Sequence, residues 1–163
     1  MFTIAFLGLT IVCIAAHMIV KRKNLSAARA VDIALMYLLL FNVGLTGLFA
    51  FYGHAFRADE VAMSIGWAPG SPFQFEIAMT NLAFGILGLL CLFFKDGFWL
   101  ATGLGYAIFL FGAAFVHIRD IVTAGNLAVN NAGPLLYLGD IALPLLLLIL
   151  LGVKWRMKGR ASV

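Results

Sequence analysis

Long apolar runs dominate the chain, and its charged residues gather at the ends of those runs. A helix crosses the hydrocarbon core of a bilayer in about 20 apolar residues, and five runs reach that length. We predict spans at about 2–20, 31–52, 73–94, 98–118 and 134–153, with Ser26 as an alternative start for the second. The pattern therefore predicts an all-α membrane protein, a five-helix transmembrane bundle that forms a single domain over residues 1–163.

Composition supports this prediction. Hydrophobic residues make up 64% of the chain and charged residues 11%, whereas charged residues make up about 25% of an ordinary soluble domain. So few charges cannot cover a water-soluble core, which excludes a soluble globular domain, a disordered chain and a nucleic-acid module. The five spans leave no room for a separate soluble domain, so we expect the function to reside in the bundle or its loops.

The basic residues predict the orientation of the bundle. Lys and Arg are enriched in cytoplasmic loops. If the loop after the first span is cytoplasmic, only Arg57 and Arg119 lie outside. The residues inside are then Lys21, Arg22, Lys23, Arg29, Lys95, Lys154, Arg156, Lys158 and Arg160. We therefore predict an N-out/C-in protein of the cell membrane, a bacterial-type inner membrane, with lipid rather than nucleic acid as the partner of the basic clusters.

The first span has no basic segment before it, so we expect an uncleaved anchor rather than a signal peptide. The loop between the second and third spans is amphipathic from Asp59 to Trp67, with Val61, Ala62 and Ile65 among its apolar positions. This pattern is typical of a short helix that lies in the membrane interface. We predict such an interfacial helix there, followed by a turn at Ala68-Pro69-Gly70-Ser71-Pro72.

Polar side chains inside apolar spans are costly and point to function. The candidates for a substrate-binding or ion-binding site are Asn42, His54, Glu76, Asn81, His117, Arg119, Asp120 and Asp140. On the predicted topology Asn42 lies near the middle of the bilayer, and the others lie in its outer half. They predict an outward-facing polar site.

Several of these residues have structural alternatives. His117 and Asp120 lie on one helix face at i,i+3 spacing, so they form a local hydrogen bond or chelate an ion together. Glu76 in the first turn of its helix suits the helix dipole. Asn42 and Asn81 suit hydrogen bonds between helices, and His54 lies at a depth where water solvates it. Asp140 has Arg119 as its expected charge partner.

One segment resembles a known family. Residues 66–76 read Gly-Trp-Ala-Pro-Gly-Ser-Pro-Phe-Gln-Phe-Glu, and residues 81–85 read Asn-Leu-Ala-Phe-Gly. The GW-x-x-GSPFQ-x-E pattern resembles the signature of a family of small bacterial and archaeal polytopic membrane proteins of unknown function. The resemblance implies a membrane protein built around this loop and the third span, and it implies no activity.

The sequence leaves several functions open. It contains no Gly-rich phosphate loop, His-Glu-x-x-His or Cys-x-x-Cys motif, so an enzyme is the less favoured reading and no catalytic residue or metal site is predicted. The first hypothesis is transport of a small solute, an ion or a proton through the outward-facing site. The second is a non-catalytic subunit that assembles with a membrane partner or with copies of itself. A third is a haem-binding or quinone-binding redox protein with His54 and His117 as axial ligands, and a fourth is a metal-dependent enzyme that uses Glu76, His117 and Asp120.

Overall fold

The structure, a computed structural model, describes residues 2–161, with Phe2, Arg160 and Ala161 described by their backbone alone. Within this range the chain is helical and contains no strand. The elements in order are α1 (Phe2–Val20), η1 (Arg22–Asn24), α2 (Ala27–Tyr37), η2 (Leu38–Leu45), α3 (Thr46–Phe56), α4 (Ala58–Ile65), α5 (Phe73–Leu90), α6 (Gly97–Ala124), α7 (Val129–Ala132), η3 (Leu135–Ala142) and α8 (Leu143–Ala161). Five helical stretches are long and apolar enough to cross a membrane. The predicted all-α architecture with five membrane-length helices is therefore confirmed, whereas its topology in a membrane stays a prediction.

The helices extend past several of the predicted spans. α2, η2 and α3 form one stretch over Ala27–Phe56, and Ser26 caps it by accepting a 3.3 Å hydrogen bond from the Arg29 amide. α6 continues to Ala124, whereas α5 ends at Leu90. Polar residues do not break a helix, so apolar composition alone does not mark where a helix ends.

Two of the membrane-length stretches contain a π-helical segment. η2 occupies the middle of the second stretch, and η3 follows α7 near the start of the last stretch. π-Helical turns are rare and often occur at functional sites. Each segment holds a buried polar residue, Asn42 in η2 and Asp140 in η3.

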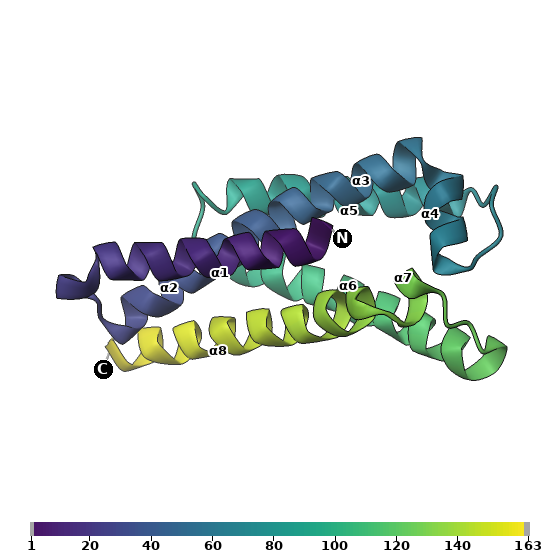
Figure 1. The fold of residues 1–163 in the computed structure, drawn as a ribbon. Coiled ribbons are helices and arrows are strands. Elements are labelled where there is room, and N and C mark those ends of the chain that lie inside the picture. The colour runs from purple at the N-terminus through teal and green to yellow at the C-terminus, as the bar shows by residue number, and fades with distance from the viewer. Residues whose placement is uncertain (1, 162–163) are drawn as a thin grey trace.

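Glycines bring the backbones of two neighbouring helices into contact. α3 and η2 run along α5 (Figure 1). A Cβ atom on Gly88 of α5 would lie 2.3 Å from the Gly44 nitrogen, and one on Gly47 would lie 2.8 Å from the Asn81 carbonyl oxygen. Small residues at helix contacts permit this approach in lipid, where hydrophobic association offers little.

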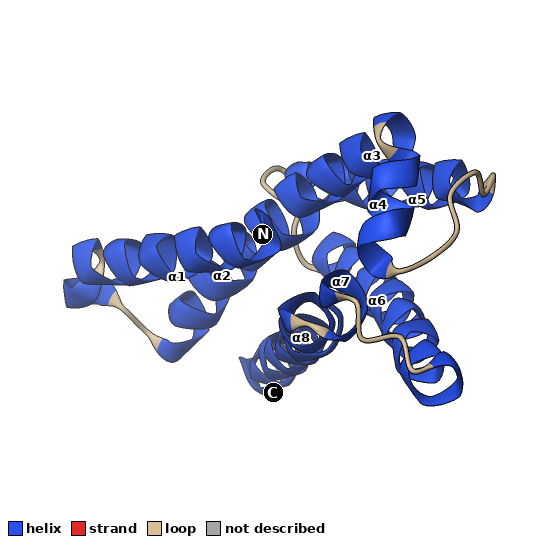
Figure 2. Ribbon diagram, turned by 45° about the vertical axis from the view of Figure 1, so that its right-hand side comes forward, coloured by secondary structure: helices blue, strands red, loops and turns tan. Residues whose placement is uncertain are grey.

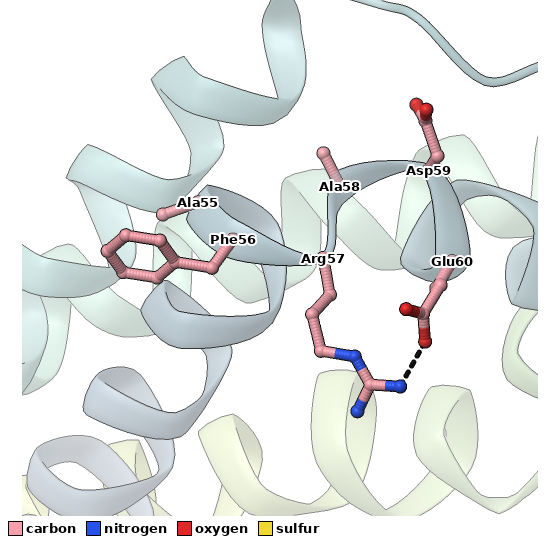
Figure 3. A pocket seen from close by; sticks show the side chains of 6 residues that line it. All are labelled: Ala55, Phe56, Arg57, Ala58, Asp59 and Glu60. Atoms are coloured by element: carbon pink, nitrogen blue, oxygen red, sulfur yellow. Dashed lines mark hydrogen bonds and ion pairs between the residues drawn. The ribbon is translucent and has the colours of Figure 1, made fainter.

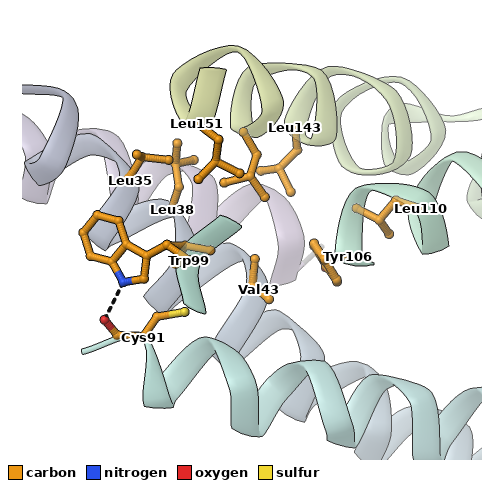
Figure 4. Close-up of a cluster of buried hydrophobic side chains, with 11 residues drawn as sticks. Leu35, Leu38, Val43, Cys91, Trp99, Tyr106, Leu110, Leu143 and Leu151 are labelled. Carbon is orange, nitrogen blue, oxygen red and sulfur yellow. Dashed lines mark hydrogen bonds between the residues drawn. The ribbon is translucent and has the colours of Figure 1, made fainter. Parts of the chain in front are cut away.

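An apolar core fills the space between η2, α6 and α8. Leu39, Trp99 and Leu147 are among its most buried members, each no more than 1% exposed. The Trp99 indole donates a 2.8 Å hydrogen bond to the Cys91 carbonyl oxygen (Figure 4). This bond fixes the turn between α5 and α6 against the core.

Ion pairs join three elements at one end of the bundle. Lys154 of α8 binds Asp32 of α2, and its ammonium lies 3.7 Å from Asp96 in the α5–α6 turn. Lys158 lies 3.3 Å from the same carboxylate. Its hydrogen bond, helped by Lys154, lowers the pKa of Asp96. The start of α2, the α5–α6 turn and the final turns of α8 therefore share one end of the molecule.

The short helices α4 and α7 pack together at the opposite end (Figures 1 and 2). α4 lies between the second and third membrane-length stretches and buries Ala62 and Ile65. Gly66 ends it in the left-handed region at φ 84°. A Cβ there would also lie 2.6 Å from the side-chain oxygen of Asn126. Both the backbone conformation and the close side chain therefore favour glycine at this position. The place of α4 in a membrane interface stays a prediction.

Candidate functional site

Two ionisable side chains meet inside the bundle near α4 and α7. His117 comes from α6 and Asp140 from η3, and each residue is only 7% exposed. The His117 Nε2 atom lies 4.0 Å from an Asp140 carboxylate oxygen. Burying a lone carboxylate in a membrane span is costly, so a basic nitrogen beside it lowers that cost.

The hydrogen bonds of Asn131 define which nitrogen of His117 faces Asp140. The Asn131 amide nitrogen donates to the Asn126 carbonyl oxygen at 2.7 Å, which orients the side-chain oxygen of Asn131 toward His117. That oxygen lies 2.7 Å from His117 Nδ1, and an amide oxygen only accepts. The proton of a neutral His117 is therefore on Nδ1, which leaves the basic Nε2 lone pair on the side of Asp140.

Trp67 covers the histidine. Its ring stacks on the imidazole with centroids 5.6 Å apart and planes 17° apart. The Trp67 indole donates a 2.9 Å hydrogen bond to Asp120, and Asn126 donates to the same carboxylate oxygen at 2.6 Å and to the Ile65 carbonyl oxygen at 2.8 Å. These bonds hold the end of α4 over His117.

The structure brings together three of the predicted site residues and leaves the others outside the cluster. The three inside it are His117, Asp120 and Asp140. The i,i+3 hydrogen bond between His117 and Asp120 does not form, because His117 bonds to Asn131 and Asp120 accepts from Trp67 and Asn126.

Arg119 is not the partner of Asp140. Its side chain is exposed, and its electrostatic interaction is with Asp120. The group beside Asp140 is His117. An arginine two residues from His117 points to a different side of α6, since neighbours on a helix face lie three or four residues apart.

The remaining candidates lie elsewhere. Glu76 is exposed, and Asn81 donates to the Ile77 carbonyl oxygen of its own helix at 2.9 Å. His54 lies 2.6 Å from Gln74, so the two histidines of the haem hypothesis have separate partners. Among residues 2–161, no group of three His, Cys, Asp or Glu side chains could hold a metal ion.

A shallow hollow of about 340 Å³ lies at the junction of α3 and α4 (Figure 3). Its lining runs from Ala55 to Glu60. The exposed side chains of Arg57 and Glu60 form an ion pair across it. The two charges satisfy each other there, so the hollow presents little unpaired chemistry to a ligand.

Sequence reasoning missed the residues that support the pair. Asn126 and Asn131 supply most of the polar contacts around His117, and Trp67 is predicted from the sequence only as the end of the interfacial helix. The sequence did carry one signal, three asparagines within residues 126–131, ahead of the predicted last span at 134–153: Asn126, Asn130 and Asn131.

Comparison with known proteins places the chain in a family. A model described as "Family of unknown function (DUF6790)" matches residues 1–160. The chain belongs to the DUF6790 family. The match to DUF6790 includes Trp67, His117 and Asp140, so the cluster lies inside the region that defines the family. No curated protein and no solved structure matched the chain, and DUF6790 has no function in its description. The chemistry of the site is therefore the basis for a functional proposal.

Proposed function

We propose that the protein takes up and releases protons at the His117–Asp140 pair, on the side of the membrane that α4 and α7 face. One observation carries the proposal: a basic imidazole nitrogen and a carboxylate lie 4.0 Å apart, both within membrane-length helices and both more than nine-tenths buried. Ionisable groups at such depth in other membrane proteins mark ion pathways and proton relays.

The packing of the pair favours a proton over a larger ligand. Trp67 stacks on the imidazole face, and Asn131 occupies its other nitrogen. Histidine is the side chain whose charge changes most readily near neutral pH. A proton requires only the Nε2 lone pair and the carboxylate, whereas a solute would have to displace Trp67.

We further propose that the pair faces the outside of a cell membrane, in an N-out/C-in chain. Nine of the 11 basic residues then lie inside, in agreement with the positive-inside rule. The ion pairs of Lys154 with Asp32 and Asp96 support this orientation, because they put the start of α2 and the final turns of α8 at one end of the bundle. The chain between these two points then crosses the membrane an even number of times, and α1 adds one crossing, so the total is odd.

Trp67 provides a direct test, because a protonated imidazole quenches the fluorescence of an indole stacked on it. The measurement is the emission of the purified protein against pH, minus that of Trp67→Phe, which removes the signals of Trp99 and Trp155. We expect a sigmoidal quench as pH falls. It should disappear in His117→Gln, whose side-chain amide can still donate to Asn131.

Asp140→Asn should move the midpoint of the quench to lower pH, because it removes a carboxylate that lies 4.0 Å from the imidazole and favours its charged form. His54→Gln is the matched control and should leave the curve unchanged. Asp120 also contacts Trp67, and its titration would survive in His117→Gln. An unaltered quench in His117→Gln would therefore refute the proposal.

A further inference from the structure

The His117–Asp140 pair is closed off from solvent, because each residue is only 7% exposed. Asn131 of α7 occupies one imidazole nitrogen, Asp140 of η3 lies beside the other, and Trp67 covers the ring face. Proton uptake requires a water molecule to reach the imidazole. One of the covering elements must therefore move, and we expect it to be the one with the least apolar burial.

α4 is held less firmly than the other two elements around the pair. α7 and η3 belong to the membrane-length stretch Val129–Gly159, which buries Leu136 and Leu147 at 1% exposure each. α4 buries only one alanine and one isoleucine, and the turn after it, residues 68–72, is exposed. Segments with few buried apolar side chains open locally at low cost, so α4 is the cover that can move.

α4 and its exit turn are joined into one unit by their own hydrogen bonds. The Gly70 amide donates to the Asp59 carboxylate at 2.8 Å, which connects the turn back to the first turn of α4. The Trp67 amide donates to the Ala62 carbonyl oxygen at 2.9 Å, which fixes the tryptophan on the end of the helix. Residues 58–70, which we call the lid, can therefore move together and carry the Trp67 ring with them.

The lid is attached to α3 and α5 and reaches across to α6 and α7 (Figures 1 and 2). Arg57 interrupts the helix between α3 and α4 at φ −134° and ψ 36°, and Pro72 precedes α5 at the other end of the lid. α3 and α5 contact each other backbone to backbone at their glycines. Both ends of the lid therefore start from one fixed support, and they are its hinge points.

Side-chain hydrogen bonds hold the middle of the lid, residues 64–67, against α6 and the segment that follows it. They join the Trp67 indole to Asp120 at 2.9 Å, the Asn126 side-chain nitrogen to the Ile65 carbonyl oxygen at 2.8 Å, and the Asn130 side-chain nitrogen to the Ser64 hydroxyl at 3.1 Å. Asp120 also accepts from Asn126 at 2.6 Å. Its carboxylate thus orients two of the three donors that keep the lid closed.

The charges of the lid lie away from the pair. Asp59 and Glu60 are exposed, and each already has a partner, the Gly70 amide and Arg57. The charged groups that act on His117 are instead Asp140 of η3 and Asp120 of α6. The lid covers the imidazole with a neutral ring, so lifting it changes solvent access without removing a charge from the pair.

We propose that the lid lifts about its two hinges to let water reach His117–Asp140, and that Asp120 is the positioning residue that keeps it closed. The inference rests on the proposed proton uptake at this pair and adds how the site is opened. The opening has to admit a water molecule rather than a solute, so a small rotation of the lid suffices.

The test fixes the lid in its closed position. Ser64→Cys and Asn130→Cys, at the two ends of a 3.1 Å contact, are joined by a short bis-methanethiosulfonate reagent that dithiothreitol removes. Every sample also carries Cys13→Ala and Cys91→Ala. Solvent access to His117 is read as the rate at which diethyl pyrocarbonate modifies its neutral imidazole, measured for each histidine by mass spectrometry.

We expect the cross-link to lower the modification rate at His117 about tenfold or more, and reduction of the same sample to restore it. His17, in the last turn of α1 at the far end of the bundle (Figure 1), is the internal control and should react at one rate throughout. Ser64→Cys capped with a monofunctional methanethiosulfonate is the matched variant. It changes the lid without fixing it and should react like the reduced protein.

A second variant loosens the lid. Asp120→Ala removes the carboxylate that accepts from Trp67 and should raise the modification rate at His117 about tenfold, the worth of one hydrogen bond to a charged group. Asp120→Asn keeps an acceptor oxygen and should stay near the wild-type rate. Arg119→Ala removes the exposed charge of the neighbouring residue and should leave the rate unchanged.

The outcomes separate the lid from proton uptake. A slower rate under the cross-link, with a normal Trp67 fluorescence titration, supports both. An unchanged rate under the cross-link, with a normal titration, overturns the lid and leaves uptake standing. Absence of the titration overturns uptake and, with it, the lid as its gate. If the double-cysteine protein fails to fold or to cross-link, Asp120→Ala decides, and a wild-type rate at His117 in that variant overturns the lid.

Discussion

Gly88→Ala is the sharpest test of the helix packing. The added Cβ would lie 2.3 Å from the Gly44 nitrogen, 2.6 Å from the Gly44 Cα and 2.8 Å from the Leu39 carbonyl oxygen. All three atoms are backbone, so no side chain can rotate away. An ordinary contact begins at 3.4 Å, and the helices must therefore separate by about 1 Å. Overpacking of this kind costs about 1–3 kcal/mol.

Some of this cost is offset, because alanine is a better helix former than glycine by up to about 1 kcal/mol. We expect a net loss of about 1–2 kcal/mol in the free energy of unfolding, measured by SDS titration in mild detergent. Gly112→Ala in α6 is the control, because nothing lies within 4 Å of its Cβ. Gly44→Ala meets its neighbours at 3.2–3.3 Å and should fall between the two. Equal unfolding of Gly88→Ala and Gly112→Ala would show that the helices do not touch at these glycines.

Three further predictions concern the two ends of the bundle. Asn131→Ala should cost about 1–3 kcal/mol, because it leaves the buried His117 ring and the Asn126 carbonyl oxygen without a partner. Asn130→Ala removes only the 3.1 Å hydrogen bond to the Ser64 hydroxyl and should cost less, about 0.5–1.5 kcal/mol; a larger loss for Asn130→Ala than for Asn131→Ala in the same SDS titration would contradict this. Ion pairs lower the pKa of Asp96 from its usual 3.8. The stabilisation that the Asp96 carboxylate provides should therefore be present above pH 3.8 and decline as the pH falls through the lowered pKa. In a series of melting temperatures against pH, Asp96→Asn should lack this decline. A C-terminal reporter that fluoresces only in the cytoplasm should be bright, and a dark reporter at normal expression would contradict the N-out/C-in orientation.

The membrane-length helices could be predicted because they depend on local composition. A run of apolar residues is stable as a helix in lipid whatever it later packs against. The close approach of α5 to the second stretch depends on small residues whose places can be read from the sequence, and the structure puts Gly44, Gly47 and Gly88 at this contact. The short helix after the second stretch followed from its own amphipathic pattern.

The candidate site could be predicted only as a set of residue types. His117 and Asp140 lie on different helices, and their contact depends on the π-helical geometry of η3, which rotates side chains away from the positions expected for an α-helix. The choice of His117 over Arg119 as the neighbour of Asp140 depends on which side of α6 packs against η3, and Arg119 lies on the exposed side. The roles of Trp67 and Asn131 depend on how α4 and α7 fold back over the bundle, which no local pattern specifies.

The ion pairs of Lys154 bear on the order in which the bundle assembles. Asp32 is synthesised 122 residues before the lysine that binds it, and chains emerge N-terminus first. Until α8 enters the membrane, Asp32 and Asp96 lack this partner, and the core face of α6 lacks Leu147 and Leu151. The first four membrane-length helices must therefore wait as an incomplete bundle. α8 completes the apolar core and the ionic contacts in one event, so mutations at Lys154 should delay maturation and increase degradation of the newly made chain.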